Sequence, residues 1–116
     1  ARRDTLEKEV VSMNDLTNKV EHLLEKIQET LLLKAQQFRD DNTHHASDWQ
    51  HFKELIAKDS GFVYAHWDGT AETEQKIKEE TKATIRCIPL NNKQEEGTCI
   101  YSKKPSSQKV IFAKAY

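Results

Sequence analysis

The clearest hydrophobic pattern in the chain is one apolar stripe, which recurs at steps of three and four residues through the first third. Its positions are Leu16, Val20, Leu23, Leu24, Ile27, Leu31, Ala35 and Phe38. Apolar residues at this spacing lie on one face of an α-helix. The pattern predicts a long helix from Met13 to about Asp40, roughly 40 Å long at 1.5 Å per residue. A small domain does not cover that length, so we expect one end to lean on a neighbouring domain.

The residues before this helix carry start signals. Ser12 is a good N-cap, and Asp15 follows three residues later, where a carboxylate meets free backbone N–H groups and the positive helix end. Val11 and Leu16 occupy the two positions of a hydrophobic staple. We therefore expect residues 12–58 to form the helical part of the chain, after residues 1–11, which read as the exit from a preceding domain.

A second, shorter helix is predicted after a loop at Asn42–Ala46. Ser47 is its expected N-cap, and Gln50 completes a capping box. A glycine near the C′ position, Gly61, ends it. Its inner face comprises Trp49, Phe52, Leu55 and Ile56. An aromatic stripe at this spacing is far more often core than a ligand platform, so we assign it to the core.

From Gly61 to Pro89 the pattern changes twice. Gly61–Trp67 is β-branched and aromatic-rich, which predicts a strand, and Glu74–Thr81 is rich in helix formers around Ile77. Ala83–Ile88 returns to β-branched alternation and is stopped by Pro89. Strand, helix and strand within roughly 30 residues predict a βαβ unit with parallel strands and a right-handed crossover.

After Pro89 a polar turn-like stretch leads to a brief extended piece at 98–101, a turn at 102–107 and a last strand within 108–115. The predicted fold class is α/β (α+β). A long N-terminal helix and a second helix pack on a small mixed three-stranded sheet that contains the βαβ unit. We expect residues 1–116 to be one domain, with the βαβ unit and the last strand in residues 61–116.

Composition and charge narrow the class of protein. Of all residues, 36% are hydrophobic and 32% are charged. Such a chain can form only a small core for its length, which a long solvent-exposed helix would explain. The net charge is −1, with nine basic and twelve acidic residues in 1–60 and nine and seven in 61–116. No apolar run approaches the roughly 20 residues of a membrane span, and no signal peptide is visible. Two cysteines do not make a disulfide framework, so we expect a reducing, cytoplasmic location. The chain begins without a methionine, which suggests a piece of a longer polypeptide.

Few residues suggest chemistry by themselves. The three glycines form no phosphate-binding loop, and neither cysteine has a histidine at a spacing that suggests a nucleophile pair. His44 and His45 are adjacent in a predicted loop without supporting ligands, so solvated histidines are the better interpretation.

The nearest thing to a site is a set of four residues in two short-range pairs, one at each end of the βαβ region: Asp68, Thr73, Cys99 and Ser102. A zinc knuckle would use this layout if all four were cysteines. Only Cys99 is a thiol, Asp68 is a possible oxygen ligand, and hydroxyl groups are poor zinc ligands. We therefore favour four ordinary turn residues over a metal site.

Four segments closely resemble the C-terminal domain of prolyl-tRNA synthetase, of the archaeal- or eukaryote-like type that carries a C-terminal extension. They are Ala1–Thr5, His66–Gly69, Lys76–Pro89 and Val110–Tyr116. The resemblance covers nearly the whole chain in order, and Ile85–Pro89 and the terminal aromatic are its most specific parts. It implies that the domain follows an anticodon-binding domain, with Arg2–Thr5 as the exit from that domain's last strand.

The resemblance also implies what the parent protein does. The parent would be a class II, homodimeric, cytoplasmic ligase that activates proline with ATP and Mg and transfers it to tRNA(Pro). The C-terminal domain would be non-catalytic and bind no cofactor. Its partners would be the catalytic and anticodon-binding domains of the same chain. It would not bind a membrane.

Two family features concern particular residues. Many members bind a structural zinc through four cysteines at the positions of Asp68, Thr73, Cys99 and Ser102. Because three of the four are replaced, we expect zinc to be absent, Asp68 to cap the helix that starts near Thr70, and segment 97–108 to be looser. The family's terminal tyrosine, here Tyr116, directs its carboxylate toward the active site of the parent enzyme. In the isolated chain we expect Tyr116 to be mobile or engaged elsewhere.

The alternative is a stand-alone tRNA- or nucleic-acid-binding module that uses the basic C-terminal region. Four lysines at 103, 104, 109 and 114, with Tyr101 and Phe112 nearby, could contact phosphates and stack bases. Exposed lysines are usually a solvated face, however, and the near-neutral total charge gives little long-range attraction. A small enzyme is a weaker option, because no nucleophile or acid–base set is present. We favour the non-catalytic domain that braces a ligase.

Overall fold

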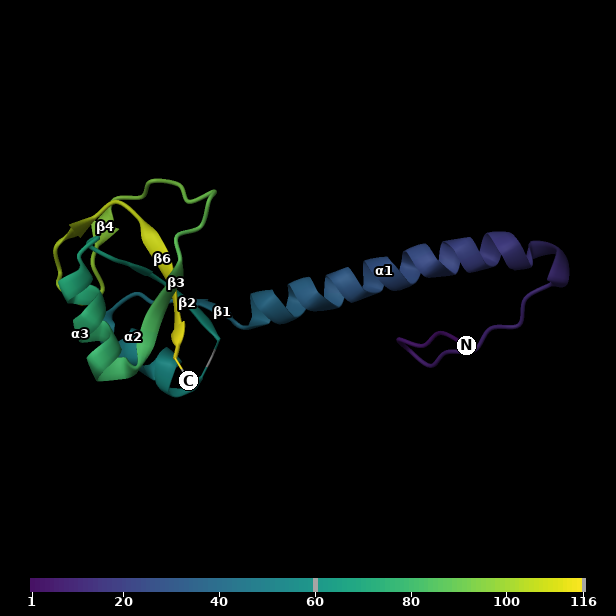
Figure 1. Ribbon diagram of the computed structural model, residues 1–116, viewed down its shortest axis with the longest axis horizontal. Helices are drawn as coiled ribbons and strands as arrows, with labels where there is room; N and C mark the ends of the chain where they lie inside the picture. Colours follow the sequence, from purple (N-terminus) through teal and green to yellow (C-terminus); the bar gives the residue numbers. More distant parts are fainter. Residues whose placement is uncertain (60, 116) are drawn as a thin grey trace. The chain divides into compact units, whose positions relative to one another are not determined.

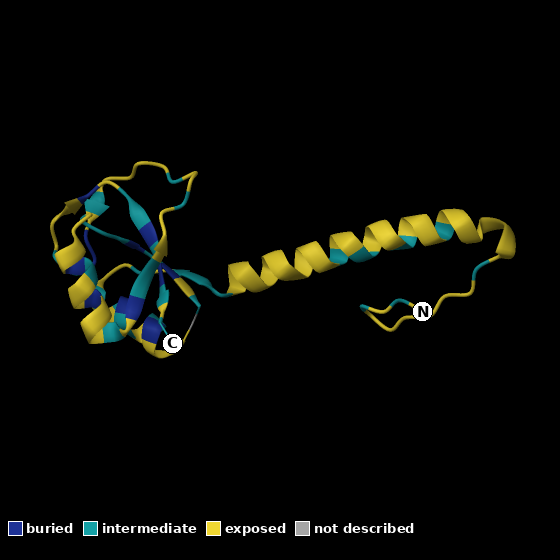
Figure 2. Cartoon of the chain, in the orientation of Figure 1, coloured by how far each residue is buried: buried dark blue, intermediate teal, exposed yellow. Residues whose placement is uncertain are grey.

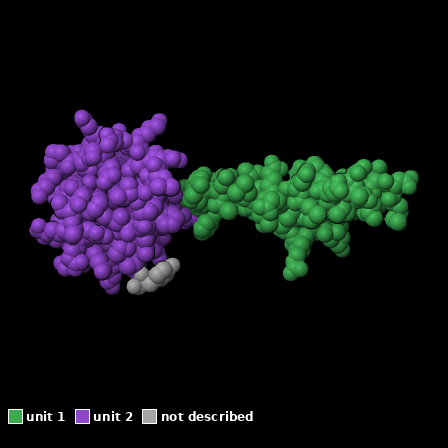
Figure 3. All heavy atoms as spheres, turned by 45° about the horizontal axis from the view of Figure 1, so that its top comes forward, with its two compact units in different colours: residues 1–40 green, residues 41–116 purple. Residues whose placement is uncertain are grey.

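The computed structural model describes residues 1–59 and 61–115. The chain divides into two compact units, residues 1–40 (unit 1) and residues 41–116 (unit 2), which Figure 3 colours separately. Each unit is described by itself. That the 116 residues act as one domain stays a prediction.

Unit 1 consists of an N-terminal segment and the predicted long helix. A short 3-10 helix, η1 (Met13–Asp15), leads into α1 (Leu16–Asp41), which has 26 residues. Ser12 is the N-cap as predicted, and its Oγ accepts from the backbone N–H of Asn14 at 3.3 Å. None of the described residues in α1 is buried (Figure 2). In its apolar stripe Leu23 and Ile27 are half-buried, and the other positions are exposed. No helix within residues 1–59 and 61–115 is long and apolar enough to cross a membrane.

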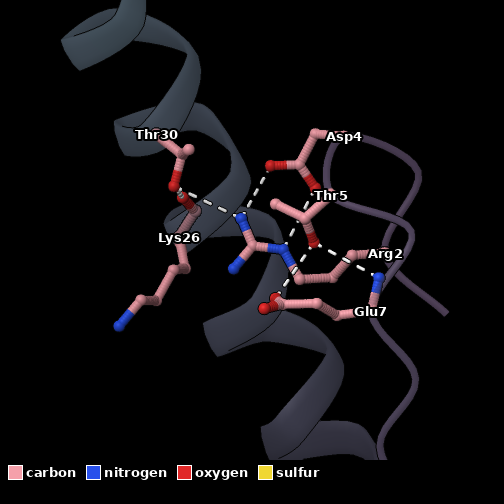
Figure 4. Close-up of polar contacts among 6 residues, drawn as sticks. All are labelled: Arg2, Asp4, Thr5, Glu7, Lys26 and Thr30. Carbon is pink, nitrogen blue, oxygen red and sulfur yellow. Dashed lines mark hydrogen bonds and ion pairs between the residues drawn. The ribbon is translucent and has the colours of Figure 1, made fainter.

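The N-terminal segment is tied to α1 through Arg2. Its guanidinium group donates to both carboxylate oxygens of Asp4, at 3.0 and 2.7 Å, and to Thr30 Oγ1 at 3.3 Å. Figure 4 shows the guanidinium between these two partners. The hydrogen bond to Asp4 raises the pKa of Arg2, and the same bond lowers the pKa of Asp4. The start of the chain is therefore fixed against the middle of the helix.

Unit 2 combines two helices with a mixed sheet (Figure 1). The helices are α2 (Trp49–Ala57) and α3 (Ala71–Thr81). The four-stranded sheet has the order β1-β2-β6-β3, formed by β1 (Thr43–His45), β2 (Phe62–His66), β3 (Ala83–Cys87) and β6 (Lys109–Lys114). A separate antiparallel pair joins β4 (Gly97–Thr98) to β5 (Pro105–Ser106). The helices and the small mixed sheet confirm the predicted α+β class.

The strand–helix–strand unit in the middle of the chain is present but split. Strands β2 and β3 are both antiparallel to β6, which lies between them, so β2 and β3 are parallel to each other. The C-terminal strand β6 therefore lies between the two strands of the βαβ unit and pairs with both, and it is not an edge strand.

The prediction of three strands and of a loop at Asn42–Ala46 was wrong. Thr43–His45 pairs in parallel with β2, in the register Thr43↔Phe62 and His45↔Tyr64, and makes a fourth strand at the sheet edge. This strand is polar and only three residues long, so it has no apolar alternation to reveal it. Pairing with β2 holds it in place, and the stacking of His45 on Tyr64 at 5.0 Å between ring centroids supports it.

The ends of α2 also differ from the prediction. At its C-terminal end, the left-handed residue directly after the C-cap Lys58 is Asp59, at φ 55°, and not Gly61. Asp48, not Ser47, is the N-cap, and its carboxylate accepts from the backbone N–H of His51 at 2.9 Å. The pKa of Asp48 is lowered mainly by this backbone bond, and Ser47 Oγ adds a second hydrogen bond at 3.1 Å. A carboxylate next to the helix start outcompetes a hydroxyl, because it also complements the helix dipole.

A single core joins both helices to one face of the sheet. It comprises Phe52, Ile56, Val63, Ala65, Ile77, Ala83, Ile100, Val110 and Phe112. Phe52 of α2 meets Phe112 of β6 edge to face, with ring centroids 5.1 Å apart. The predicted inner face of the second helix is confirmed at Phe52 and Ile56, which are buried, while Trp49 and Leu55 pack at the margin.

Candidate functional site

Three of the four predicted zinc-knuckle positions meet at one carboxylate. Asp68 follows β2, Thr73 lies in the first turn of α3, and Ser102 lies in the turn after Cys99. Asp68 Oδ2 accepts from Thr73 Oγ1 at 2.8 Å and from Ser102 Oγ at 2.5 Å. We call the Asp68 carboxylate with its donors Thr70, Thr73 and Ser102 the carboxylate hub.

Local sequence explains why Asp68 is placed there. Gly69, at φ 80°, turns the chain so that Asp68 Oδ1 accepts from the backbone N–H of Thr70 at 3.1 Å and from its Oγ1 at 2.8 Å. Thr70, not Asp68, is the N-cap of α3, and its Oγ1 accepts from the N–H of Thr73 at 3.3 Å. Asp68 therefore orients the capping residue Thr70 by accepting hydrogen bonds from it. This corrects the expectation that Asp68 caps the helix itself.

The hub keeps the carboxylate ionised. Partial burial raises the pKa of Asp68, but hydrogen bonds from Ser102, Thr70 and Thr73 outweigh it and lower the pKa from 3.8 to about 2. Each oxygen accepts two hydrogen bonds, which is close to the full capacity of a carboxylate. The hub joins the loop after β2, the start of α3 and the 99–104 turn.

Cys99 is buried but takes no part in the hub's hydrogen bonds. Its backbone closes the neighbouring turn, with Cys99 N–H donating to Lys104 O at 2.8 Å and Lys103 N–H donating to Cys99 O at 3.2 Å. Both Cys99 and Cys87 are free cysteines. Of the four knuckle positions, only Cys99 carries a sulfur atom.

These residues do not fit a structural zinc ion. Such sites use thiolates, imidazoles or carboxylates in a tetrahedral set, and here two positions are hydroxyls that donate to the third. Within residues 1–59 and 61–115, no cluster of three or more His, Cys, Asp or Glu could hold a metal. The absence of zinc stays a prediction. It rests on the chemistry of these side chains, because Thr73 and Ser102 present hydroxyl groups where a four-cysteine site would present thiolates.

Sequence reasoning missed the second half of this region. The segment expected to be loose forms the β4–β5 pair, and Ile100 N–H donates to His66 O at 2.9 Å. The buried Ser106 hydroxyl lies 2.7 Å from Trp67 O and 3.1 Å from His66 Nδ1. A signal for the hub was present in Asp68-x-Thr70, a spacing typical of a turn closed by an aspartate side chain.

The remaining predicted site residue, Tyr116, lies outside the described residues. The described chain ends at Ala115, whose N–H donates to Lys82 O at 2.7 Å just beyond the end of β6.

Comparison with known proteins agrees with the resemblance noted above. The family model described as "Prolyl-tRNA synthetase, C-terminal" matches residues 49–116. Proline–tRNA ligase from Cytophaga hutchinsonii is 53% identical over 116 residues, which is 100% of this chain and 24% of that protein. The ligases from Flavobacterium johnsoniae (51% over 116 residues, 24% of the protein) and Chlorobaculum tepidum (55% over 124 residues, 25%) also match along the whole chain.

In each case the chain spans about a quarter of the length of the curated relatives it matches. The family model covers more than half of the chain, from the start of α2 onward. The chain therefore belongs to the family of prolyl-tRNA synthetase C-terminal domains.

Proposed function

We propose that this chain is the non-catalytic C-terminal part of a proline–tRNA ligase, which attaches proline to tRNA(Pro) in an ATP-dependent reaction. The observation that carries the proposal is the match of the whole chain to proteins named proline–tRNA ligase at about half identity. The parent enzyme is a class II, cytoplasmic homodimer that uses ATP and Mg. Its active-site chemistry lies in the other domains.

The chain's role is to brace those domains. Most of the apolar stripe of α1 is exposed, with Leu24 at 62% and Leu31 at 50% exposure, and such a stripe on a solvated helix indicates a partner surface. The catalytic and anticodon-binding domains of the same chain are the proposed partners. Tyr116 presents its terminal carboxylate toward the active site.

In the alternative of a stand-alone nucleic-acid-binding module, Tyr101 and Phe112 would stack on bases, but neither side chain is available for that. Phe112 is fully buried in the core, and Tyr101 is engaged edge-on with Trp49 and donates its hydroxyl to Glu80 at 2.7 Å. Lys109 pairs with Glu95 at 2.9 Å. A platform for bases needs exposed aromatic faces, so these residues favour the bracing role.

The function is tested by aminoacylation with the full-length parent. The parent should charge tRNA(Pro) with proline, and deletion of Tyr116 should lower kcat by about tenfold or more, since a misplaced active-site group commonly costs that much. Tyr116→Phe is the matched control, because it keeps the ring and the terminal carboxylate. A parent that charges no tRNA with proline would contradict the proposal. Full activity after the deletion would contradict the proposed role of Tyr116 near the active site.

Zinc content is a separate expectation. Elemental analysis of the purified chain should find less than about a tenth of an equivalent of zinc, because two of the four knuckle positions are hydroxyl donors. Addition of EDTA should leave the unfolding temperature unchanged. Stoichiometric zinc that is lost on Cys99→Ser substitution would show that the site is a metal site after all.

A further inference from the structure

A basic pocket lies at the end of the sheet in unit 2 where β6 ends and β3 begins. Its lining includes Asp59, Gly61, Phe62, Lys82, Arg86 and Lys114. We propose that this basic pocket binds backbone phosphates of the tRNA substrate in the parent ligase. The inference rests on the proposed function and adds a contact that the bracing role does not require.

The charge of the basic pocket is concentrated, and no described residue forms an ion pair with its three cations. The cations are Lys82, Arg86 and Lys114, and all three are exposed. Among the described lining residues, three cations therefore accompany one carboxylate, that of Asp59. In a chain of net charge −1, such a local excess is a departure from the average surface.

Arg86 is held in place for binding. Its Nη2 donates to the backbone oxygen of Lys114 at 2.8 Å, which bridges β3 to the end of β6. The bond uses one of the five N–H donors of a guanidinium group and leaves the charge uncancelled, since a carbonyl oxygen is neutral. A guanidinium fixed by a single carbonyl bond can offer its other N–H groups to a phosphate in the usual two-pronged geometry.

Lys82 occupies a backbone conformation that disfavours a lysine. It is the C-cap of α3 at φ 61°, in the left-handed region where helices usually end with glycine or asparagine. Asp59, on the same pocket, is also left-handed, at φ 55°. The turn at Lys82 leads directly from α3 into β3, which begins at Ala83.

Phe62 supplies the second element of a nucleic-acid surface. It lines the basic pocket and is 42% exposed, although it lies in a strand next to the core. Cationic groups that follow a phosphate backbone, together with an exposed aromatic face, are the usual combination for single-stranded RNA.

The test compares two triple variants of the 116-residue chain with the same change in charge. The first is Lys82→Asn, Arg86→Gln and Lys114→Gln, in which asparagine tolerates the left-handed backbone. The control is Lys93→Gln, Lys103→Asn and Lys104→Gln. Lys103 is also left-handed, at φ 61°, but it lies away from the basic pocket lining. Circular dichroism checks that both variants are folded, and Lys82→Asn alone serves if the first triple is not.

Binding to tRNA(Pro) is measured by fluorescence anisotropy from about 50 to 300 mM salt. We expect the pocket triple to weaken binding about tenfold and to reduce the slope of log K against log salt by about two to three, one for each lost phosphate contact. The control should change the slope by less than about one. Equal effects of both triples would indicate diffuse attraction and overturn the proposal.

An unchanged affinity of the pocket triple would overturn it as well, and would leave the pocket as a protein contact. The proposed function is checked separately by the charging activity of the unmodified parent. A parent that charges tRNA(Pro) while the pocket triple binds normally rejects this inference alone. A parent that charges no tRNA rejects the proposed function.

Discussion

Asp68→Ala should destabilise unit 2 by about 2–4 kcal/mol, because hydrogen bonds to a charged group contribute about 1.5–3 kcal/mol each and do not add fully. The carboxylate accepts from Thr70, Thr73 and Ser102. Its removal also leaves the Thr73 hydroxyl, in a residue that is 5% exposed, without its acceptor. Urea unfolding followed by tryptophan fluorescence measures the loss. Glu96→Ala, an exposed acid in the loop before β4, is the control and should stay within about 0.5 kcal/mol.

The same carboxylate makes stability depend on pH. Its pKa in the folded chain is about 2, below the ordinary value of 3.8. A lowered folded pKa gives stability that is present above the unfolded pKa and is lost as the pH falls through the folded one. The wild-type chain should therefore lose this contribution between about pH 4 and pH 2. Asp68→Asn should flatten that part of the curve, and an identical pH dependence in both proteins would contradict the role of the hub.

Local patterns were sufficient to predict α1 and the core face of α2. A stripe repeated through α1 needs no knowledge of the rest of the fold, because helix periodicity is set by neighbouring turns. Phe52 and Ile56 were recognisable for the same reason. The split βαβ unit was predicted from its order of elements, but not the position of β6 between its strands, since pairing across the sheet is not encoded within either strand.

Features that depend on residues far apart in the chain could not be predicted from local sequence patterns. The polar strand Thr43–His45 exists because β2 pairs with it, and its own residues would suit a loop. The hub joins Asp68 to Ser102, 34 positions apart, through hydroxyl bonds that have no sequence pattern. The resemblance to a zinc knuckle brought these positions to attention. Only the geometry shows that the hydroxyl groups of Thr73 and Ser102 donate to the Asp68 carboxylate.

We expect the apolar core to be sufficient for this unit to fold without a metal ion, and Phe112→Ala tests that expectation. Phe112 is 0% exposed on the central strand β6, lies opposite both Val63 and Ile85 in the sheet register, and packs on Phe52. Truncation of a buried phenylalanine costs about 3–5 kcal/mol, from lost burial and the cavity that remains. Because domains are typically stable by about 5–15 kcal/mol, the variant should be partly unfolded or close to it.

The unfolding midpoint in urea measures this loss, with Phe38→Ala as the matched control. Phe38 is the same residue type at 72% exposure on α1, and its replacement should change stability by less than about 0.5 kcal/mol. If Phe112→Ala were as stable as the control, the helices and sheet would not be held together by this core. Stabilisation would then have to come from the hub or from a ligand. If Phe112→Ala lowers the unfolding midpoint equally in EDTA and in zinc, burial of apolar side chains stabilises this unit whether or not zinc is present.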